Sequence, residues 1–67
     1  MSHLLETAKA SAKLAFRRMM DAATAAANVH MLMADEATDP EAASKCRHAA
    51  QKWQNVAQEA YRHWSGT

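Results

Sequence analysis

The chain has 67 residues, of which 49% are hydrophobic and 22% charged, with a formal net charge of +1. This length allows one small domain, the near-neutral charge favours no class of partner, and the single cysteine excludes an internal disulfide. No apolar run approaches the ~20 residues of a membrane-spanning helix, and the first residues lack the cationic segment of a signal peptide. We therefore expect a cytoplasmic protein.

The first predicted helix spans residues 2 to about 36 and is rich in good helix formers such as alanine, leucine and methionine. Its apolar side chains recur in alternating steps of three and four residues, the pattern of a helix seam. This first row consists of Leu5, Ala8, Ala12, Ala15, Met19, Ala22, Ala26, Val29 and Met33. Beside it lies a second row of Phe16, Met20, Ala23, Ala27 and Ala34. Roughly half of the circumference is apolar, which is more than one neighbouring helix covers.

The periodic pattern stops at Pro40, the only proline of the chain, so residues 37–39 are predicted to form a turn. Asp39 suits the N-cap of a following helix, and Pro40 suits its first helical position. Thr38 with Glu41 three residues later also matches a capping box. Either arrangement starts a second helix at residue 40.

The second helix is expected to run to about residue 64, where Ser65-Gly66 supplies a stop signal. Its apolar row contains Ala42, Cys46, Ala49, Trp53, Val56, Ala60 and Trp64. Folding the helices back places residues whose numbers sum to about 76 beside each other. This register puts Trp53 against Ala22, Ala23 and Ala26, and Trp64 against Ala12 and Ala15. We therefore expect Trp53→Ala to cost ~3–5 kcal/mol.

The fold predicted from these patterns is all-α, an antiparallel hairpin of two long helices in a single domain covering residues 1–67. Because the first helix is apolar over too wide an arc, we expect two hairpins to form a homodimeric four-helix bundle. The residues assigned to its core or dimer interface are Leu5, Phe16, Met19, Met20, Val29, Met33, Trp53, Val56 and Trp64. The turn is acidic and the open end is basic, so a head-to-tail dimer would bring opposite charges together.

No group of residues specifies a reaction, and we expect neither an enzyme nor a cofactor. His30 and Cys46 should lie level across the hairpin, where two copies could supply four zinc ligands. The simpler interpretation is a buried histidine beside a cysteine that packs as a small hydrophobe. A metal-linked dimer is therefore the third hypothesis for this chain.

A row of basic residues offers a second hypothesis, binding to RNA or DNA. Lys9, Lys13 and Arg17 follow one another at four-residue steps, and Arg62 lies on the second helix. The hairpin plan over most of the chain resembles the Rop-type RNA-binding bundle, in which two helical hairpins dimerise. No sequence motif is shared, this turn contains proline and the helices are unequal, so no RNA-contact residue is carried over.

The leading hypothesis is a small protein-binding regulator, adaptor or inhibitor. Leu14 and Leu32 are eighteen residues apart, so they superimpose on a helical wheel, on the side that should face solvent. Met31 lies beside Leu32, and methionine suits surfaces that adapt to a partner. We expect these three side chains to dock on another protein, as in compact bacteriophage inhibitors of host proteins. Packing or surface scatter is the alternative explanation.

Overall fold

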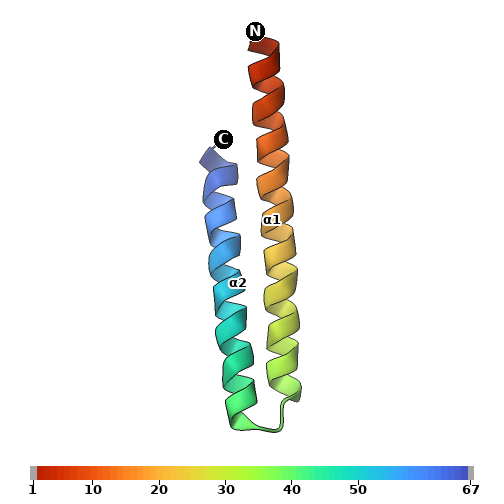
Figure 1. Ribbon diagram of the computed structural model, residues 1–67, viewed down its shortest axis with the longest axis vertical. Coiled ribbons are helices and arrows are strands. Elements are labelled where there is room, and N and C mark those ends of the chain that lie inside the picture. Colours follow the sequence, from red (N-terminus) through yellow and green to blue (C-terminus); the bar gives the residue numbers. More distant parts are fainter. Residues whose placement is uncertain (1, 67) are drawn as a thin grey trace.

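The computed structural model describes residues 2–66, which form two helices and one tight turn. Helix α1 runs from Ser2 to Glu36 and helix α2 from Pro40 to Gly66. The two helices pack side by side as an antiparallel hairpin that measures 58 × 14 × 11 Å (Figure 1). The predicted all-α hairpin is confirmed.

Helix α1 continues for 35 residues because nothing in its sequence breaks it. Its two described threonines donate their hydroxyls to carbonyl oxygens one turn back, Thr7 to His3 at 2.9 Å and Thr24 to Met20 at 2.8 Å. The Arg17 Nε lies 3.4 Å from the Asp21 Oδ2 on the solvent side. Such pairs at helical spacing stabilise the helix by a few tenths of a kcal/mol, about 0.2–0.5 each.

The turn shows which of the two capping arrangements the chain uses. The amide of Ala37 donates to the carbonyl oxygens of Met33 and Ala34, at 3.0 and 3.3 Å, and α1 ends there. The side chain of Asp39 then accepts the amide of Glu41 at 3.3 Å, while its carbonyl accepts the amide of Ala43 at 3.0 Å. Asp39 is therefore the N-cap of α2, and Pro40 occupies the first helical position.

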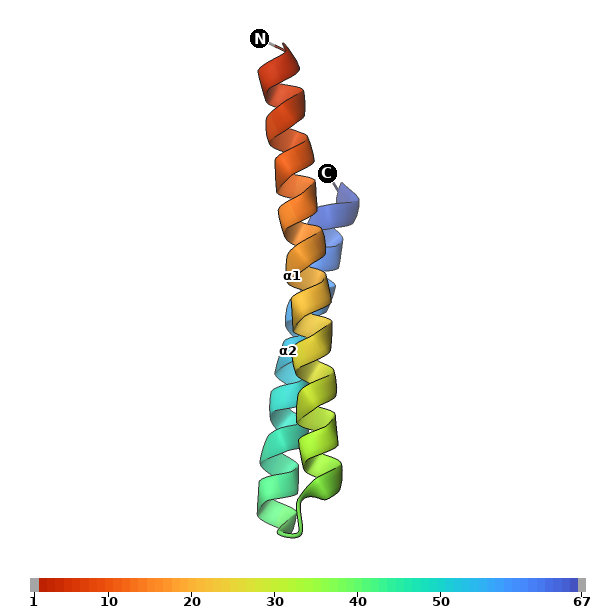
Figure 2. The same cartoon turned by 90° about the vertical axis from the view of Figure 1, so that its right-hand side faces the viewer.

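The core of the hairpin is built from alanine. Among residues 3–66 no side chain larger than alanine is buried. The buried residues, which we call the alanine seam, are Ala23, Ala27, Ala34, Ala43, Ala50 and Ala60. Half-buried side chains border the seam, namely Phe16, Met20, Ala26, His30, Ala37, Cys46, Ala49, Ala57 and Trp64. Both views show the two helices close together from the turn to the end of α2 (Figures 1 and 2).

The structure corrects the expected packing of the two apolar rows of α1. The second row faces α2, whereas Met19, Val29 and Met33 of the first row are about half exposed. Trp53 and Val56, expected to fill the space between the helices, are each 40% exposed. Alanine against alanine lets two backbones approach more closely than an indole would, which pushes the large side chains to the flank. The expected cost of Trp53→Ala therefore does not apply to an isolated hairpin.

The two helices end at different levels at the open end of the hairpin. Helix α2 continues two residues past Trp64 and includes Gly66, so Ser65-Gly66 does not stop it where the sequence suggested. Helix α1 is longer still, and its N-terminal turns extend beyond the end of α2 (Figure 1). We call residues 2–9 the overhang. It carries Leu4 and Leu5, which are 71% and 58% exposed.

Candidate interaction surface

One broad side of the hairpin gathers large apolar side chains from both helices. On α1, helical phase places Met19, Val29 and Met33 along one strip, and on α2 Trp53 and Val56 flank the alanine seam. The smaller Ala15, Ala22, Ala26, Ala42 and Ala49 fill the space between them. We call this surface the apolar face. All five of its large side chains are at least 40% exposed.

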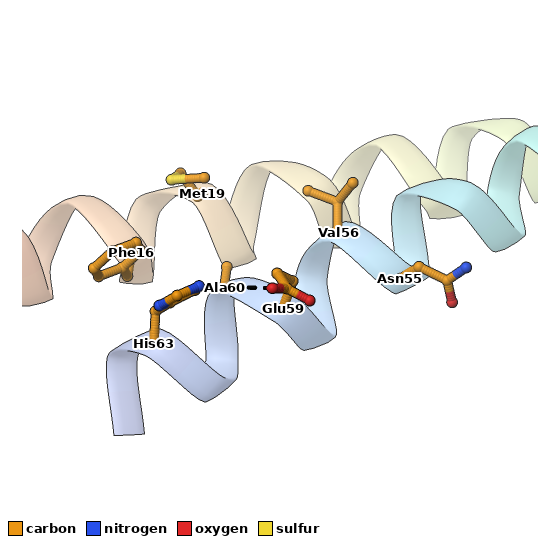
Figure 3. Close-up of a pocket in the computed structure, with 7 residues that line it drawn as sticks. All are labelled: Phe16, Met19, Asn55, Val56, Glu59, Ala60 and His63. Carbon is orange, nitrogen blue, oxygen red and sulfur yellow. Dashed lines mark ion pairs between the residues drawn. The ribbon is translucent and has the colours of Figure 1, made fainter. Parts of the chain in front are cut away.

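A shallow groove of about 400 Å³ crosses the apolar face toward the open end of the hairpin. It is lined by Phe16, Met19, Asn55, Val56, Glu59, Ala60 and His63 (Figure 3). The rings of Phe16 and His63 stack with centroids 4.9 Å apart and planes 16° apart. The Glu59 Oε1 lies 3.7 Å from the Nε2 of the same histidine. The walls are thus mostly apolar, with one carboxylate and one imidazole at the rim.

The chemistry available in this groove is limited. A carboxylate beside an imidazole can hold or orient a proton, but no nucleophile lies between them, and within residues 2–66 no three His, Cys, Asp or Glu side chains converge as a metal site. The groove has no motif in the sequence, although the register of about 76 brings Phe16 and Ala60 level. Its mostly apolar walls can accept an apolar side chain.

A second groove of about 490 Å³ lies along the other flank of the alanine seam. Its lining is Met20, Thr24, Ala57, Gln58, Tyr61 and Arg62, which is more polar than the first. Tyr61, a residue that the sequence analysis did not single out, is 52% exposed, and its ring lies 5.8 Å from that of Trp64. The two flanks of the seam therefore differ in polarity, and the flank that belongs to the apolar face is the more hydrophobic one.

The candidate docking residues Leu14, Met31 and Leu32 remain uncovered in the hairpin. Their exposed fractions are 51%, 40% and 63%. Leu14 and Leu32 share one line along α1, about 27 Å apart at 1.5 Å per residue. This line points away from both α2 and the apolar face, so the structure keeps these leucines on a separate surface. We call it the leucine line.

Most of the candidate nucleic-acid residues already have partners within the chain. The Lys13 Nζ lies 5.2 Å and the Arg17 Cζ 5.7 Å from the centre of the Trp64 ring. Arg17 also pairs with Asp21, and the Arg62 guanidinium lies 4.0 Å from the Glu59 carboxylate. Among the part of the chain described, Lys9 alone of the four candidates has no ion pair or ring contact. The Arg17 and Arg62 side chains remain 53% and 76% exposed in these contacts.

His30 and Cys46 are both half-buried. The Nδ1 atom of His30 is buried without a hydrogen-bond partner in the described structure. Neither residue is close to a group of further ligands that would complete a metal site in residues 2–66. Within one hairpin the pair acts as part of the packing.

Comparison with known proteins identifies no relative: no family model, curated protein or solved structure matches the chain. The likeness to the Rop-type bundle is therefore one of hairpin plan. Over residues 2–66, neither helix carries an apolar stretch that could cross a bilayer. Function has to be argued from the surfaces themselves.

Proposed function

We propose that this chain is a non-catalytic protein-interaction module, a homodimeric four-helix bundle that acts as a regulator, adaptor or inhibitor of another protein. The observation that carries the proposal is that, over residues 3–66, the hairpin buries only alanine and leaves its large apolar side chains on the surface. The apolar face serves self-association, and the leucine line serves the second protein.

An alanine core supports the need for a partner copy. Burial contributes about 0.8 kcal/mol per methylene-sized group, against about 1.5–3 kcal/mol for a whole leucine, methionine or phenylalanine side chain. With six buried alanines in residues 3–66, the hairpin gains little from its own packing. Covering the apolar face with a second hairpin buries Met19, Val29, Met33, Trp53 and Val56, and with them most of the available hydrophobic free energy.

The length of the hairpin suits a stable dimer. Its whole broad side measures 58 × 14 Å, about 800 Å², so a second copy that lies along the full length, overhang included, can bury close to what each partner buries in a standard interface. The centre of this side is apolar and its rim carries charged residues such as Lys52 and Glu59, the usual composition of such contacts.

The leucine line remains available in such a dimer because it points away from the apolar face. Two exposed leucines about 27 Å apart on one helix present anchors at a spacing that a long groove or a second helix can match. Met31 adds a flexible apolar contact beside Leu32.

Sedimentation equilibrium at micromolar concentration tests self-association. The wild-type chain should have twice its monomer mass. Met19→Glu, in the middle of the apolar face, should have the monomer mass because the dimer would bury an unpaired carboxylate. Leu14→Glu is the matched control, with similar exposure on the same helix, and should remain dimeric. A monomeric wild type would refute the dimer.

Affinity capture from a cell lysate tests the leucine line. Leu14→Glu/Leu32→Glu should lose the proteins that the wild type recovers, whereas the control Gln51→Glu/Gln58→Glu, which adds the same two charges at exposed positions of α2, should keep them. Identical recovery by wild type and the leucine variant would remove the docking role from this line. A gel shift that weakens steeply with salt would favour nucleic acid as the partner instead.

A further inference from the structure

We propose that the second copy lies head to tail on the apolar face with the two-fold axis at Met19 of α1. The overhang of each chain then covers the turn end of the other, and Trp53 of each chain fills the groove of the other. This inference rests on the proposed dimer and adds its direction and register.

The unequal helices are the first observation. Helix α1 has 35 residues and α2 has 27, so by the hairpin register Gly66 lies level with about residue 10. The register is supported by the contacts of Phe16 with His63 and of Lys13 with Trp64. Nothing in the described part of the chain covers Leu4 and Leu5. A second α1, antiparallel and centred on the midpoint of the first, extends far enough to cover both.

Five residues of the first row of α1 are placed symmetrically about that midpoint. Residue 19 is the centre of a helix that spans residues 2–36. An axis there places residues whose numbers sum to about 38 beside each other. Leu5 then meets Met33 of the second copy, Ala12 meets Ala26, and Met19 meets Met19. Large side chains thus meet at the two ends and the centre, and alanines meet at two levels between them. Val29 falls level with Lys9, whose aliphatic stem can cover it.

Charge favours the same direction. Residues 1–18 and 57–67, at the open end, contain five basic and two acidic side chains, a net charge of +3. Residues 19–56, toward the turn, contain three basic and five acidic side chains, a net charge of −2. Head-to-tail packing brings these opposite halves together, whereas parallel packing brings like halves together, within a Debye length of about 10 Å.

The groove on the apolar face provides a site for the largest side chain of that face. Trp53 lies four residues toward the turn from the level of Met19, so the axis carries it to the level of residue 15 on α1 of the second copy. That level lies between Met19 and His63, where the groove of about 400 Å³ is lined by Phe16, Ala60 and the stacked imidazole (Figure 3). An indole in this position would rest against an aromatic wall.

Distances between two nitroxide labels, measured by pulsed electron paramagnetic resonance on the full-length dimer, test the arrangement. Cys46→Ala removes the native thiol, and alanine is the residue type of the seam beside it. Thr38→Cys, at the exposed turn, then carries one label per chain. The head-to-tail register centred on Met19 predicts about 57 Å between turns, which is twice nineteen residues at 1.5 Å. Ser44→Cys, at an exposed position of α2, is the second label site and should give about 39 Å along the bundle, twice thirteen residues at 1.5 Å.

The possible outcomes separate this inference from the proposed dimer. A parallel dimer would give one short distance at Thr38, about 20 Å for neighbouring helix pairs, and would overturn the direction while leaving the dimer intact. About 45 Å at Thr38 would place the axis near Trp53 and overturn the register. A monomer mass for the unlabelled wild type in sedimentation would overturn both proposals. The Ser44 label keeps the test decisive if the Thr38 variant fails to fold, because a parallel dimer would again give about 20 Å.

Discussion

The alanine seam and the apolar face have the same helical period, but the first is buried and the second is exposed. The alanine seam is closed, with every one of its residues at most 7% exposed, whereas the large side chains of the apolar face are at least 40% exposed. The difference lies in side-chain size. Small residues select the face along which two helices come closest, and large residues are left for a neighbour that packs at a wider spacing.

Larger side chains in the alanine seam should have the largest effect, because they remove the close packing that distinguishes the seam from the apolar face. Ala27→Leu and Ala50→Leu, at positions 2% and 1% exposed, should each lower the free energy of unfolding by about 1–3 kcal/mol. The added isobutyl groups force the helices apart along their closest contact. Urea unfolding followed by circular dichroism measures the loss. Ala25→Leu, at an exposed position, is the control, and its free energy of unfolding should lie within about 0.5 kcal/mol of wild type. Equal stability of all three variants would contradict the close packing of the two helices along the alanine seam.

Truncating the apolar face should have a different signature, because its burial depends on a second copy. Trp53→Ala should lower the stability of the dimer by about 3 kcal/mol per chain. The loss should shrink as the protein is diluted, since the indole is already 40% exposed in the single hairpin. Melting temperatures over a hundredfold range of concentration measure this. A loss that is the same at every concentration would mean that Trp53 packs within its own hairpin.

The turn should stabilise the hairpin alone. Asp39→Ala removes the carboxylate that accepts the Glu41 amide, and should cost about 1 kcal/mol at any protein concentration. Thr38→Ala is the matched control and should cost much less, because Asp39 is the N-cap. Urea unfolding of both variants distinguishes them. A larger loss of stability for the threonine variant would mean that Thr38, in a capping box with Glu41, is the N-cap.

The smallest effect on stability is expected at the contact of Lys13 with Trp64, near the open end of the hairpin. Lys13→Met removes the ammonium group over the Trp64 ring but keeps the apolar stem, so it should cost about 0.5 kcal/mol. Lys9→Met, which removes a charge from the overhang, should leave the hairpin unchanged. Thermal unfolding monitored by Trp64 fluorescence in a Trp53→Phe background compares the two. Equal effects would assign the loss to net charge and not to the ring contact.

Much of the fold could be predicted from local patterns. Pro40 with Asp39 before it marks the start of α2, and the uninterrupted helix formers up to Glu36 mark the extent of α1. These features depend on backbone geometry within a few residues, which the sequence displays directly. The end of α2 was less predictable, because Gly66 can continue a helix as well as end one.

The candidate surface could be predicted only in part. The exposure of Leu14 and Leu32 was expected from their place on the wheel, but the stacking of His63 on Phe16 and the contact of Lys13 with Trp64 were not. Those contacts depend on how far the two helices are rotated about their axes. Periodicity within one helix carries no information on that rotation.

The amino-acid sequence by itself determined two helices, one turn and an excess of apolar surface, because helix formers, a capped proline and repeated spacing act locally. Only the tertiary structure decided which apolar row closes the hairpin. Both rows of α1 fit the period of a helix, and the choice between them depends on how closely two backbones can approach. That approach is a property of the helix pair, and alanine against alanine allows the closest contact.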